Sequence, residues 1–335
     1  MNTKSRWIFS VVLVASLAAL AGAGTISIPL VTVGDPGNVA DPATGYGSVP
    51  YTYSIGEYDV TIGDYTAFLN SVAKSGDPYG LYNPKMASTS IGIVQTSTSA
   101  GYSYAVKGNG GMPVFDVNWG DTTRFTNWLA NGQPTGAEGP GTTETGTYTL
   151  SGATSNSGLM KVTRNPGSTW VLPTVDEWYK AAYYVGGGTN AGYWAYPTQS
   201  NTPPSNVLSV TGTNNANSYD VNNGFTATTG ITPVGAFAAS PGPYGTYDMG
   251  GDVWQWNETA IGGGRGVGGG SWADVSAALA SRGGGDVLPS GVSSSLGFRV
   301  AYVPEPSSAA MLIAAAALIG FFFLKPYTPS RRARS

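Results

Sequence analysis

The chain has 335 residues, of which 41% are hydrophobic and 10% are charged. Its 49 glycines and 22 prolines make up about a fifth of the sequence, below the ~25–30% that is typical of disordered chains. The absence of cysteine excludes disulfides, and the absence of histidine removes the usual general base and the usual zinc or copper ligand. The composition therefore predicts a loop-rich globular domain without disulfides.

Both ends of the chain have the pattern of targeting segments rather than of folded structure. Lys4 and Arg6 precede an apolar run and a small-residue A-x-A site, so residues 1–23 are predicted to be a secretory signal peptide. Near the other end, an apolar run over residues 309–324 is followed by a basic tail. The run is slightly shorter than the ~17–25 residues that span a bilayer, and the basic tail should stay cytoplasmic. By itself this segment predicts a C-terminal membrane anchor.

The part of the chain between these ends is acidic. Six of the 16 Lys and Arg residues lie in the two end segments, which leaves 10 against 19 Asp and Glu and a net charge near −9. Nucleic acid is not an expected partner, because phosphate binding needs clustered positive charge. An acidic chain without His or Cys is better suited to a calcium-like cation held by carboxylate, amide and carbonyl oxygens.

Four apolar stretches predict strands. Residues 26–33 are β-branched and end in a Gly-Asp-Pro turn, and residues 51–58 alternate in polarity. Residues 113–117 predict a buried strand, and residues 296–302 a closing strand. The polar, Gly- and Thr-rich segment 133–158 is expected to be an exposed hairpin or loop.

Three capping boxes predict the starts of helices. Thr61, Asn118 and Thr174 are each followed three residues later by Asp or Glu. Apolar residues at helical spacing then predict a first helix to about Ala73 and a second to about Asn131, and the third covers the sequence WYKAAYY. The pattern as a whole predicts an α+β domain with about three short helices.

The stretch PVGAFAASPGPYGTYDMGGDVWQW, residues 233–256, carries the strongest functional signal. Its glycines permit close backbone approach and positive φ, and Asp248, Asp252 and free carbonyls can converge on one hard cation. Trp254 and Trp256 alternate with Gln255, so a strand here would place both indoles on one face. The alternative interpretation is a glycine-rich loop under two core tryptophans.

This stretch resembles the formylglycine-generating enzyme family, or sulfatase-modifying factor domain, where the pattern reads roughly PVGSF…(Y/F)GLYDMxGNVWEW. Other motifs of the family occur in this chain in the same order as in the family. PVFDVNWGD and LPTVDEW precede the stretch, and GGSW and GFR come after it. The resemblance covers about residues 26–303, with Gly268 standing where the family has an arginine. It implies a single domain with the C-type-lectin-like fold of the formylglycine-generating enzymes, which has a small mixed sheet, helices and much ordered loop.

The resemblance implies oxidase chemistry only where a copper-binding cysteine pair is present. Here Asp274 stands near the first cysteine position, and small apolar residues cover the second. Neither aspartate nor alanine replaces a thiolate as a copper(I) ligand or reactant. Formylglycine formation and copper binding are therefore not expected. Ser271 lacks a histidine base, and Lys180 lies on a predicted helix, so neither stands out as a nucleophile.

The resemblance also implies structural calcium at two places. At the first, Gln255 replaces a glutamate of the family and supplies one neutral oxygen. The alternative is that these residues stabilise loops without a metal. The first site maps to Asp248, Gly251, Val253 and Gln255, and the second to Asn206, Val207, Asn223 and Phe225.

The C-terminal segment resembles a PEP-CTERM sorting signal, because Pro304-Glu305-Pro306 precedes the apolar run and the basic tail. For residues 304–335 this implies transient membrane anchoring and cleavage by an exosortase. It implies release to the cell envelope or extracellular matrix of a Gram-negative bacterium.

Two functional hypotheses follow. The first is a non-catalytic binding protein of the cell surface or exopolysaccharide matrix, which engages a glycan or a protein through loops around residues 262–291. The second is an exported enzyme with altered, cysteine-independent chemistry on the same fold. A carboxylate pair in the pocket under residues 271–279 would favour the enzyme, and an aromatic, uncharged groove would favour the binding protein.

Overall fold

The computed structural model describes residues 25–188, 191–228 and 230–304. The predicted signal peptide and nearly all of the predicted sorting signal lie outside the described residues, so both stay predictions. Within the described part of the chain, no helix has the length and apolar character needed to cross a membrane.

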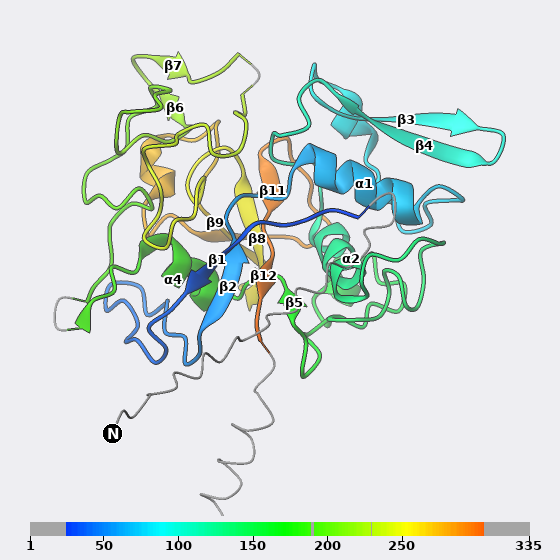
Figure 1. The fold of residues 1–335 in the computed structure, drawn as a ribbon, viewed down its shortest axis with the longest axis horizontal. Coiled ribbons are helices and arrows are strands. Elements are labelled where there is room, and N and C mark those ends of the chain that lie inside the picture. The colour runs from blue at the N-terminus through cyan, green and yellow to red at the C-terminus, as the bar shows by residue number, and fades with distance from the viewer. Residues whose placement is uncertain (1–24, 189–190, 229, 305–335) are drawn as a thin grey trace, which may run out of the picture.

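The described residues contain four α-helices, and three of them begin at the predicted capping boxes (Figure 1). At Thr61, Asn118 and Thr174, the side chain of the cap accepts the N–H of the third helical residue, whose carboxylate accepts the N–H of the cap. The remaining helix, α3, is a single short turn. The helices are α1 (Ile62–Val72), α2 (Trp119–Ala130), α3 (Asn156–Leu159) and α4 (Val175–Tyr183), with 3₁₀ turns η1 (Pro84–Ala87) and η3 (Ser276–Leu279).

The strands form two four-stranded sheets and two hairpins. The first sheet has the order β1 (Leu30–Val33), β2 (Tyr53–Gly56), β12 (Ala301–Tyr302) and β5 (Trp170–Val171). The second has the order β10 (Gly285–Val287), β9 (Gly264–Gly268), β8 (Trp254–Ile261) and β11 (Leu296–Phe298). The hairpins are β3 (Gly92–Thr98) with β4 (Gly101–Lys107), and β6 (Tyr219–Asp220) with β7 (Gly224–Phe225).

The predicted closing strand is divided between the two sheets. Strand β11 pairs in parallel with β8, whereas β12 pairs antiparallel with β2 and β5. The chain passes from one sheet to the other at Arg299, whose side chain is fully buried between them. This arginine therefore lies where the sheets meet.

Two apolar clusters fill the domain. The larger joins α1 and α2, where the Phe68 ring lies 5.3 Å from the rings of both Phe125 and Trp128. Both indoles of β8 pack on this cluster, Trp256 fully and Trp254 partly buried, as the alternation predicted. The smaller cluster joins α4 to the first sheet and includes Tyr53, Ile55, Val171, Trp178, Tyr183 and Ala301.

Two sequence expectations are wrong. Residues 113–117 are buried but form no strand, because Asp116 has a φ of +57° and the backbone bonds to separate segments through Val114 and Asp116. Segment 133–158 is a loop up to the start of α3 at Asn156, but its centre is buried rather than exposed. Asn127 of α2 donates to the carbonyls of Thr143 and Tyr148 and so draws the loop inward.

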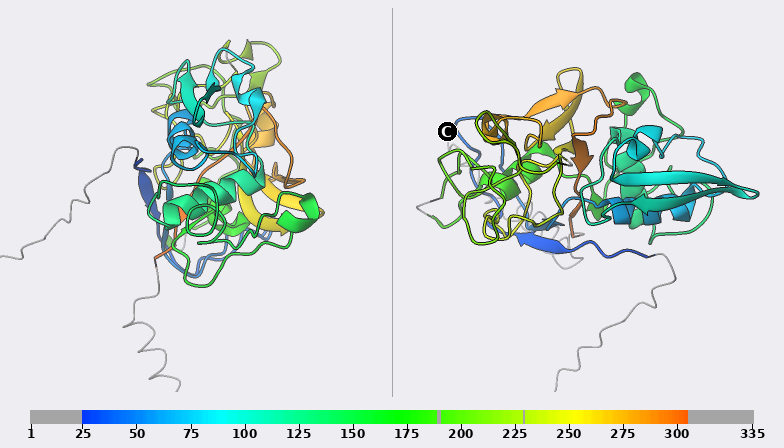
Figure 2. Two further views of the ribbon diagram at one scale, coloured as in Figure 1. Left: turned by 90° about the vertical axis from the view of Figure 1, so that its right-hand side faces the viewer. Right: turned by 90° about the horizontal axis from the view of Figure 1, so that it is seen from above.

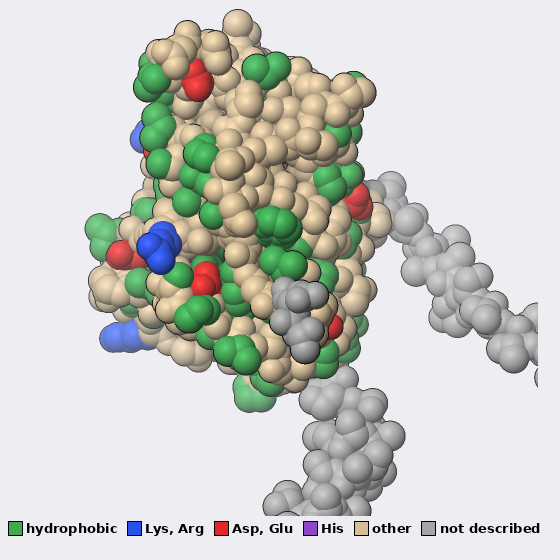
Figure 3. Space-filling model, turned by 90° about the vertical axis from the view of Figure 1, so that its left-hand side faces the viewer, with side chains coloured by type: hydrophobic (Ala, Val, Ile, Leu, Met, Phe, Trp, Pro, Cys, Tyr) green, Lys and Arg blue, Asp and Glu red, His purple; other side chains and the backbone are tan. Residues whose placement is uncertain are grey.

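The β3–β4 hairpin projects from the body of the domain, as two views at right angles show (Figures 1 and 2). The face on the opposite side is mostly backbone and uncharged side chains, with isolated cations and carboxylates (Figure 3). A surface of this kind agrees with the low charge content of the sequence.

Candidate functional site

The stretch 233–256 is a loop until it enters β8, and buried hydrogen bonds fix it. Asp252 has a φ of +53°, and its carboxylate accepts the side-chain amide of Asn217 at 2.7 Å and the backbone N–H of Thr232 at 2.6 Å. A Cβ at Gly251 would lie 2.1 Å from the carbonyl oxygen of Asn217, so only glycine fits. Asp252 therefore ties this loop to two neighbouring loops.

At the first predicted calcium site, a hydrogen bond links two of the predicted ligands, Asp248 and Gln255, to each other. Asp248 accepts the backbone N–H of Gly235 at 2.6 Å, and its carbonyl accepts the amide N–H of Gln255 at 2.6 Å. The amide oxygen of Gln255 accepts two donors at 2.7 Å, the indole of Trp178 and the guanidinium of Arg299. Both lone pairs of this oxygen are used, so Gln255 as placed does not fit the role of a calcium ligand.

Asp248 fits a cation better than Gln255 does. It lines a polar cavity of about 10 Å³, room for one water molecule or ion. Thr246 lines the same cavity, and its buried hydroxyl has no hydrogen-bond partner among the described residues. Of the other predicted ligands, Gly251 donates its N–H to Gly269, and Val253 is buried in the larger core cluster.

Arg299 carries the positive charge at this site. Its guanidinium donates to the carbonyls of Gly56 and Tyr247, both at 2.8 Å, and lies 3.3 Å from Asp59. Burial raises the pKa of Asp59 to about 8, although Arg299 opposes the shift. Burial also raises the pKa of Asp248, while the hydrogen bond from the Gly235 N–H and the charge of Arg299 act to lower it. Arg299 thus joins β2, the loop and β8, as a structural partner of buried carboxylate and carbonyl groups.

At the second predicted calcium site, Asn206 lies beside β7. Its side-chain amide donates to the carbonyl of Gly224 at 2.8 Å. The side chains of Val207 and Phe225 are more than half exposed, and Asn223 donates its N–H to the carboxylate of Asp220 at 2.8 Å. Asp220 is thus a carboxylate at this site that the sequence mapping missed. No group of three or more carboxylates arranged to hold a metal occurs among the described residues.

Asp274, which the resemblance places near the family's first cysteine position, makes hydrogen bonds within the fold. Asp274 Oδ2 accepts the indole N–H of Trp254 at 2.8 Å, the hydroxyl of Ser271 at 2.5 Å and the backbone N–H of Ser271 at 3.1 Å. Lys180 donates to the carbonyl of Asp35 at 2.8 Å, and burial lowers its pKa. Each of these candidate reactive groups is engaged by the fold.

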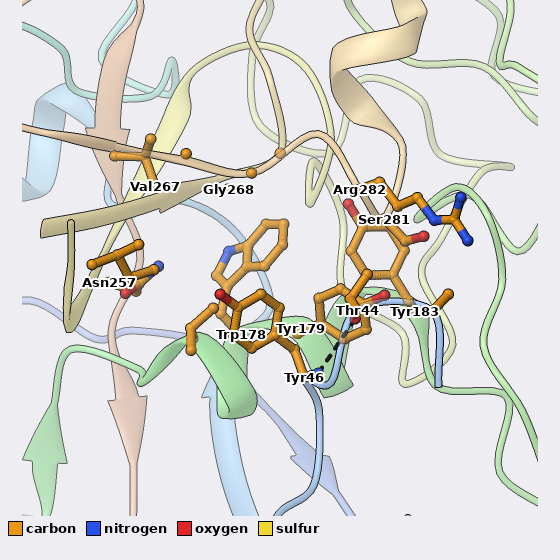
Figure 4. Close-up of a pocket in the computed structure, with 16 residues that line it drawn as sticks. Thr44, Tyr46, Trp178, Tyr179, Tyr183, Asn257, Val267, Gly268, Ser281 and Arg282 are labelled. Carbon is orange, nitrogen blue, oxygen red and sulfur yellow. Dashed lines mark hydrogen bonds between the residues drawn. The ribbon is translucent and has the colours of Figure 1, made fainter. Parts of the chain in front are cut away.

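A cavity of about 290 Å³ lies between α4, β8 and β9, loop 43–46 and segment 281–285 (Figure 4). We name it the aromatic pocket, because rings form much of its wall. The Tyr179 ring lies 6.0 Å from the ring of Tyr46 and 4.8 Å from that of Tyr183. Its size is at the lower end of the range for small-molecule sites, roughly 300–1,000 Å³.

The polar groups of the aromatic pocket are few. Thr44, Asn257 and Ser281 supply neutral hydrogen-bonding groups, and Arg282 is the one charged side chain among the described residues that line it. Figure 4 shows Arg282 on the side of Tyr183, away from the Trp178 indole. The pocket uses part of the predicted loop region. It is aromatic, but Arg282 gives it a charge, so it meets only part of the condition that would favour a binding protein.

The sequence hypotheses missed Tyr46 and Arg282 as site residues. Arg282 lies in the glycine-rich sequence SRGGG, shortly after the second cysteine position, and that neighbourhood was the one available signal. Tyr46 carried no signal, because it reaches the pocket from a loop about 235 residues away along the chain.

Comparisons with solved structures found similar chains. The chain is similar to the crystal structure of CarF (22% identity, TM-score 0.48, covering 82% of this chain and 98% of CarF). It is also similar to variable protein 1 of Treponema denticola, with 19% identity and a TM-score of 0.50, over 85% of this chain and 98% of that one. A third similar structure is PvdO from Pseudomonas aeruginosa, with 16% identity and a TM-score of 0.41, over 82% of this chain and 91% of that one. A comparison with curated proteins found no match.

A family model for the sulfatase-modifying factor enzyme 1-like domain matches residues 31–303. This range contains both four-stranded sheets except Leu30 of β1, the four described α-helices and every residue of the aromatic pocket. The chain therefore belongs to the sulfatase-modifying factor enzyme 1-like (FGE-sulfatase) family.

Proposed function

We propose that this protein is a non-catalytic binding member of the family, and that its ligand occupies the aromatic pocket. The observation that carries the proposal is the use of Asp274, near the first cysteine position, as the acceptor for Trp254 and Ser271. A side chain engaged in this way anchors the loop and leaves no reactive group in the place where the family performs oxidation.

The lining of the aromatic pocket supports binding rather than turnover. Its walls combine aromatic rings with a few polar groups, which is the usual make-up of ligand sites. No Asp, Glu or Lys side chain of the described residues lines it, so it lacks the paired acid and base that most hydrolytic chemistry needs.

A glycan and peptide array with the mature protein tests this proposal. Tyr46→Ala should remove the binding seen for the wild type, because Tyr46 is the partly exposed ring at the pocket. Tyr102→Ala, on the β3–β4 hairpin, is the matched control and should bind normally. Binding that survives Tyr46→Ala, or the absence of any binding, would overturn the assignment of the pocket.

The alternative of altered chemistry has one observation in its favour. Glu258 lines a separate cavity of about 200 Å³, and its carboxylate accepts the hydroxyl of Tyr148 at 2.7 Å and Arg164 at 2.9 Å. Burial raises the pKa of Glu258, as suits a general acid. Turnover in a substrate screen that Glu258→Gln abolishes and Tyr46→Ala leaves unchanged would establish this alternative.

We also propose that the protein is exported and that an exosortase removes its C-terminal segment, leaving it in the envelope or the extracellular matrix. The sequence pattern of residues 1–23 and 304–335 supports this. Intact-mass analysis of secreted protein should show no tail beyond about Ser307. Secreted protein that retains Arg334 would contradict the sorting proposal.

We propose a structural calcium ion at the loop of Asp248, with Asp248 as its charged ligand. The buried, unpartnered hydroxyl of Thr246 beside the same small cavity supports this choice. A bound ion would offset the repulsion among inward-pointing oxygens and would hold the loop in place. Gln255 has no part in the proposed site, because its oxygen already accepts two donors. The second site, around Asn206, is proposed to use the carboxylate of Asp220.

A further inference from the structure

We propose that the ligand of the aromatic pocket is an acidic saccharide, and that Arg282 selects it by pairing with a carboxylate or sulfate on the sugar ring. This inference rests on the proposed binding function and deepens it. It gives the pocket a ligand class and assigns a role to a residue that the sequence motifs left without one.

Arg282 differs from the other described arginines in having no partner among the described residues. Five arginines fall in the described part of the chain, and four of them are engaged and at least largely buried. Arg282 is exposed and makes no hydrogen bond or ion pair with any described residue. The engaged four are Arg124 with Glu144, Arg164 with Glu177 and Glu258, Arg265 with three carbonyls, and Arg299 with Asp59.

Two carboxylates near the pocket, Asp41 and Asp176, are already occupied by other partners. Asp41, next to the loop that carries Tyr46, accepts the hydroxyl of Tyr179 at 2.5 Å and a backbone N–H at 2.9 Å. Asp176, at the start of α4, accepts the backbone N–H of Gly47 at 2.8 Å. Both carboxylates hold the loop in place, so Arg282 keeps its full capacity to bind an external oxyanion.

The backbone around Arg282 is held in place by hydrogen bonds and a tight turn. Ser281 donates its N–H to Ala195 at 2.8 Å, and Gly283 donates its N–H to Ala280 at 2.7 Å. A Cβ at Gly283 would lie 2.2 Å from the carbonyl oxygen of Ala278, so this tight turn needs glycine. An arginine on an ordered turn loses little backbone entropy when it binds a ligand.

The character of the walls favours a sugar as the carrier of the acidic group. The rings of Tyr46 and Trp178 offer apolar surface for the C–H face of a sugar, and Thr44 and Ser281 offer hydroxyls for its oxygens. The planar guanidinium fits a carboxylate or sulfate bidentately. A nucleotide is a poor fit, because a single cation in an acidic protein supplies little of the charge that phosphates need.

Calorimetric titration of the mature protein with matched probes tests the inference. The probes are a uronic-acid oligosaccharide, the same oligosaccharide with its carboxyls reduced to alcohols, and a sulfated oligosaccharide of equal length. The wild type should bind an acidic probe about tenfold or more tightly than the reduced one, since hydrogen bonds to charged groups are the stronger kind. The two acidic probes show whether carboxylate or sulfate is preferred.

Three variants complete the test. Arg282→Ala should lose the preference for acidic probes but retain weak binding of the reduced probe, and Arg282→Lys should keep part of the preference. Lys74→Ala removes an exposed cation from the end of α1, on the far side of the domain, and should behave as the wild type. It controls for the change in net charge.

The outcomes separate the inference from the proposed function. Equal binding of acidic and reduced probes, abolished by Tyr46→Ala, would overturn the role of Arg282 and keep the pocket. Binding of acidic peptides but of no saccharide would overturn the saccharide class. Binding of acidic saccharides that neither Tyr46→Ala nor Arg282→Ala affects would overturn both the inference and the assignment of the pocket.

Discussion

The indole N–H of Trp254 donates a hydrogen bond to Asp274 Oδ2 over 2.8 Å. Trp254 belongs to the motif stretch that enters β8, and the family resemblance implies that Asp274 stands near the position of the family's first cysteine. The bond therefore joins two segments that carry family motifs in this chain. The carboxylate of Asp274 also accepts the hydroxyl of Ser271, so it links β8 to the loop that follows the Gly-Gly-Ser-Trp motif.

Replacing Asp274 should destabilise the fold. Asp274→Ala leaves the Trp254 indole and the Ser271 hydroxyl without their acceptor, which should lower the free energy of unfolding by about 1–3 kcal/mol. Asp274→Asn should lose less, because one carbonyl oxygen remains. Urea unfolding followed by tryptophan fluorescence measures both. Equal stability of Asp274→Ala and the wild type would show that the contact is dispensable.

The protein should not convert a sulfatase-type cysteine peptide to an aldehyde and should not bind copper(I) tightly. The sequence contains neither cysteine nor histidine, so no soft ligand set remains beyond methionine. Incubation with copper, oxygen and the peptide, followed by mass spectrometry, measures this directly. Protein-dependent formation of the aldehyde would refute the non-catalytic account.

Calcium should stabilise the fold through Asp248. A ligand that binds only the native state adds about 2.7 kcal/mol at a hundredfold excess over Kd. A chelator should therefore lower the melting temperature by several degrees, and magnesium should restore it poorly because it requires a tighter octahedral shell. Differential scanning calorimetry with and without chelator provides the measurement.

Three variants locate the calcium effect. Asp248→Ala should have a low melting temperature that falls less than that of the wild type when a chelator is added. Asp220→Asn should lose only the part of the chelator-induced fall that comes from the second site. Asp274→Ala should show the same chelator-induced fall as the wild type. If the wild type and Asp248→Ala respond identically to chelator, no ion is bound at the Asp248 loop.

Stability should fall as the pH rises, in part because of Glu138. Burial, and then repulsion from Asp77, raise the pKa of Glu138 to about 9, while Arg124 opposes the shift. A carboxyl whose pKa is higher in the folded state stabilises the fold fully below its unfolded pKa of roughly 4.5, and this stabilisation is lost as pH rises towards 9. Each pH unit in that window costs up to about 1.4 kcal/mol.

Glu138→Gln tests this pH dependence. The uncharged amide imitates the protonated carboxyl, so the variant should lose less stability than the wild type between pH 5 and about 9. Glu144→Gln, which weakens the pair with Arg124, should instead destabilise across the whole range. Parallel pH profiles for Glu138→Gln and the wild type would exclude Glu138 as the source.

Local features of the fold could be predicted from the sequence. The capping boxes at Thr61, Asn118 and Thr174 join residues three positions apart, so the cap and its partner appear together in the sequence. The alternation of Trp254 and Trp256 likewise follows from the geometry of one strand.

Features that depend on distant partners could not be predicted. Segment 113–117 has the composition of a strand, but the positive φ of Asp116 and its bond to Ser293 prevent one. The aromatic pocket is assembled from four separate segments, and Tyr46 and Arg282 come together only through the tertiary fold. The hydrogen bonds that Trp178 and Arg299 donate to the amide oxygen of Gln255 also join residues that are far apart in the sequence.

The most direct test of binding without conversion is recovery of the ligand. A saccharide that binds the wild type but not Tyr46→Ala is incubated with a stoichiometric amount of the wild-type protein, released by denaturation and analysed by intact mass. The account predicts that the saccharide is recovered unchanged, with a mass identical to that of a sample incubated with Tyr46→Ala. A cleaved, oxidised or otherwise altered saccharide in the wild-type sample alone would contradict it.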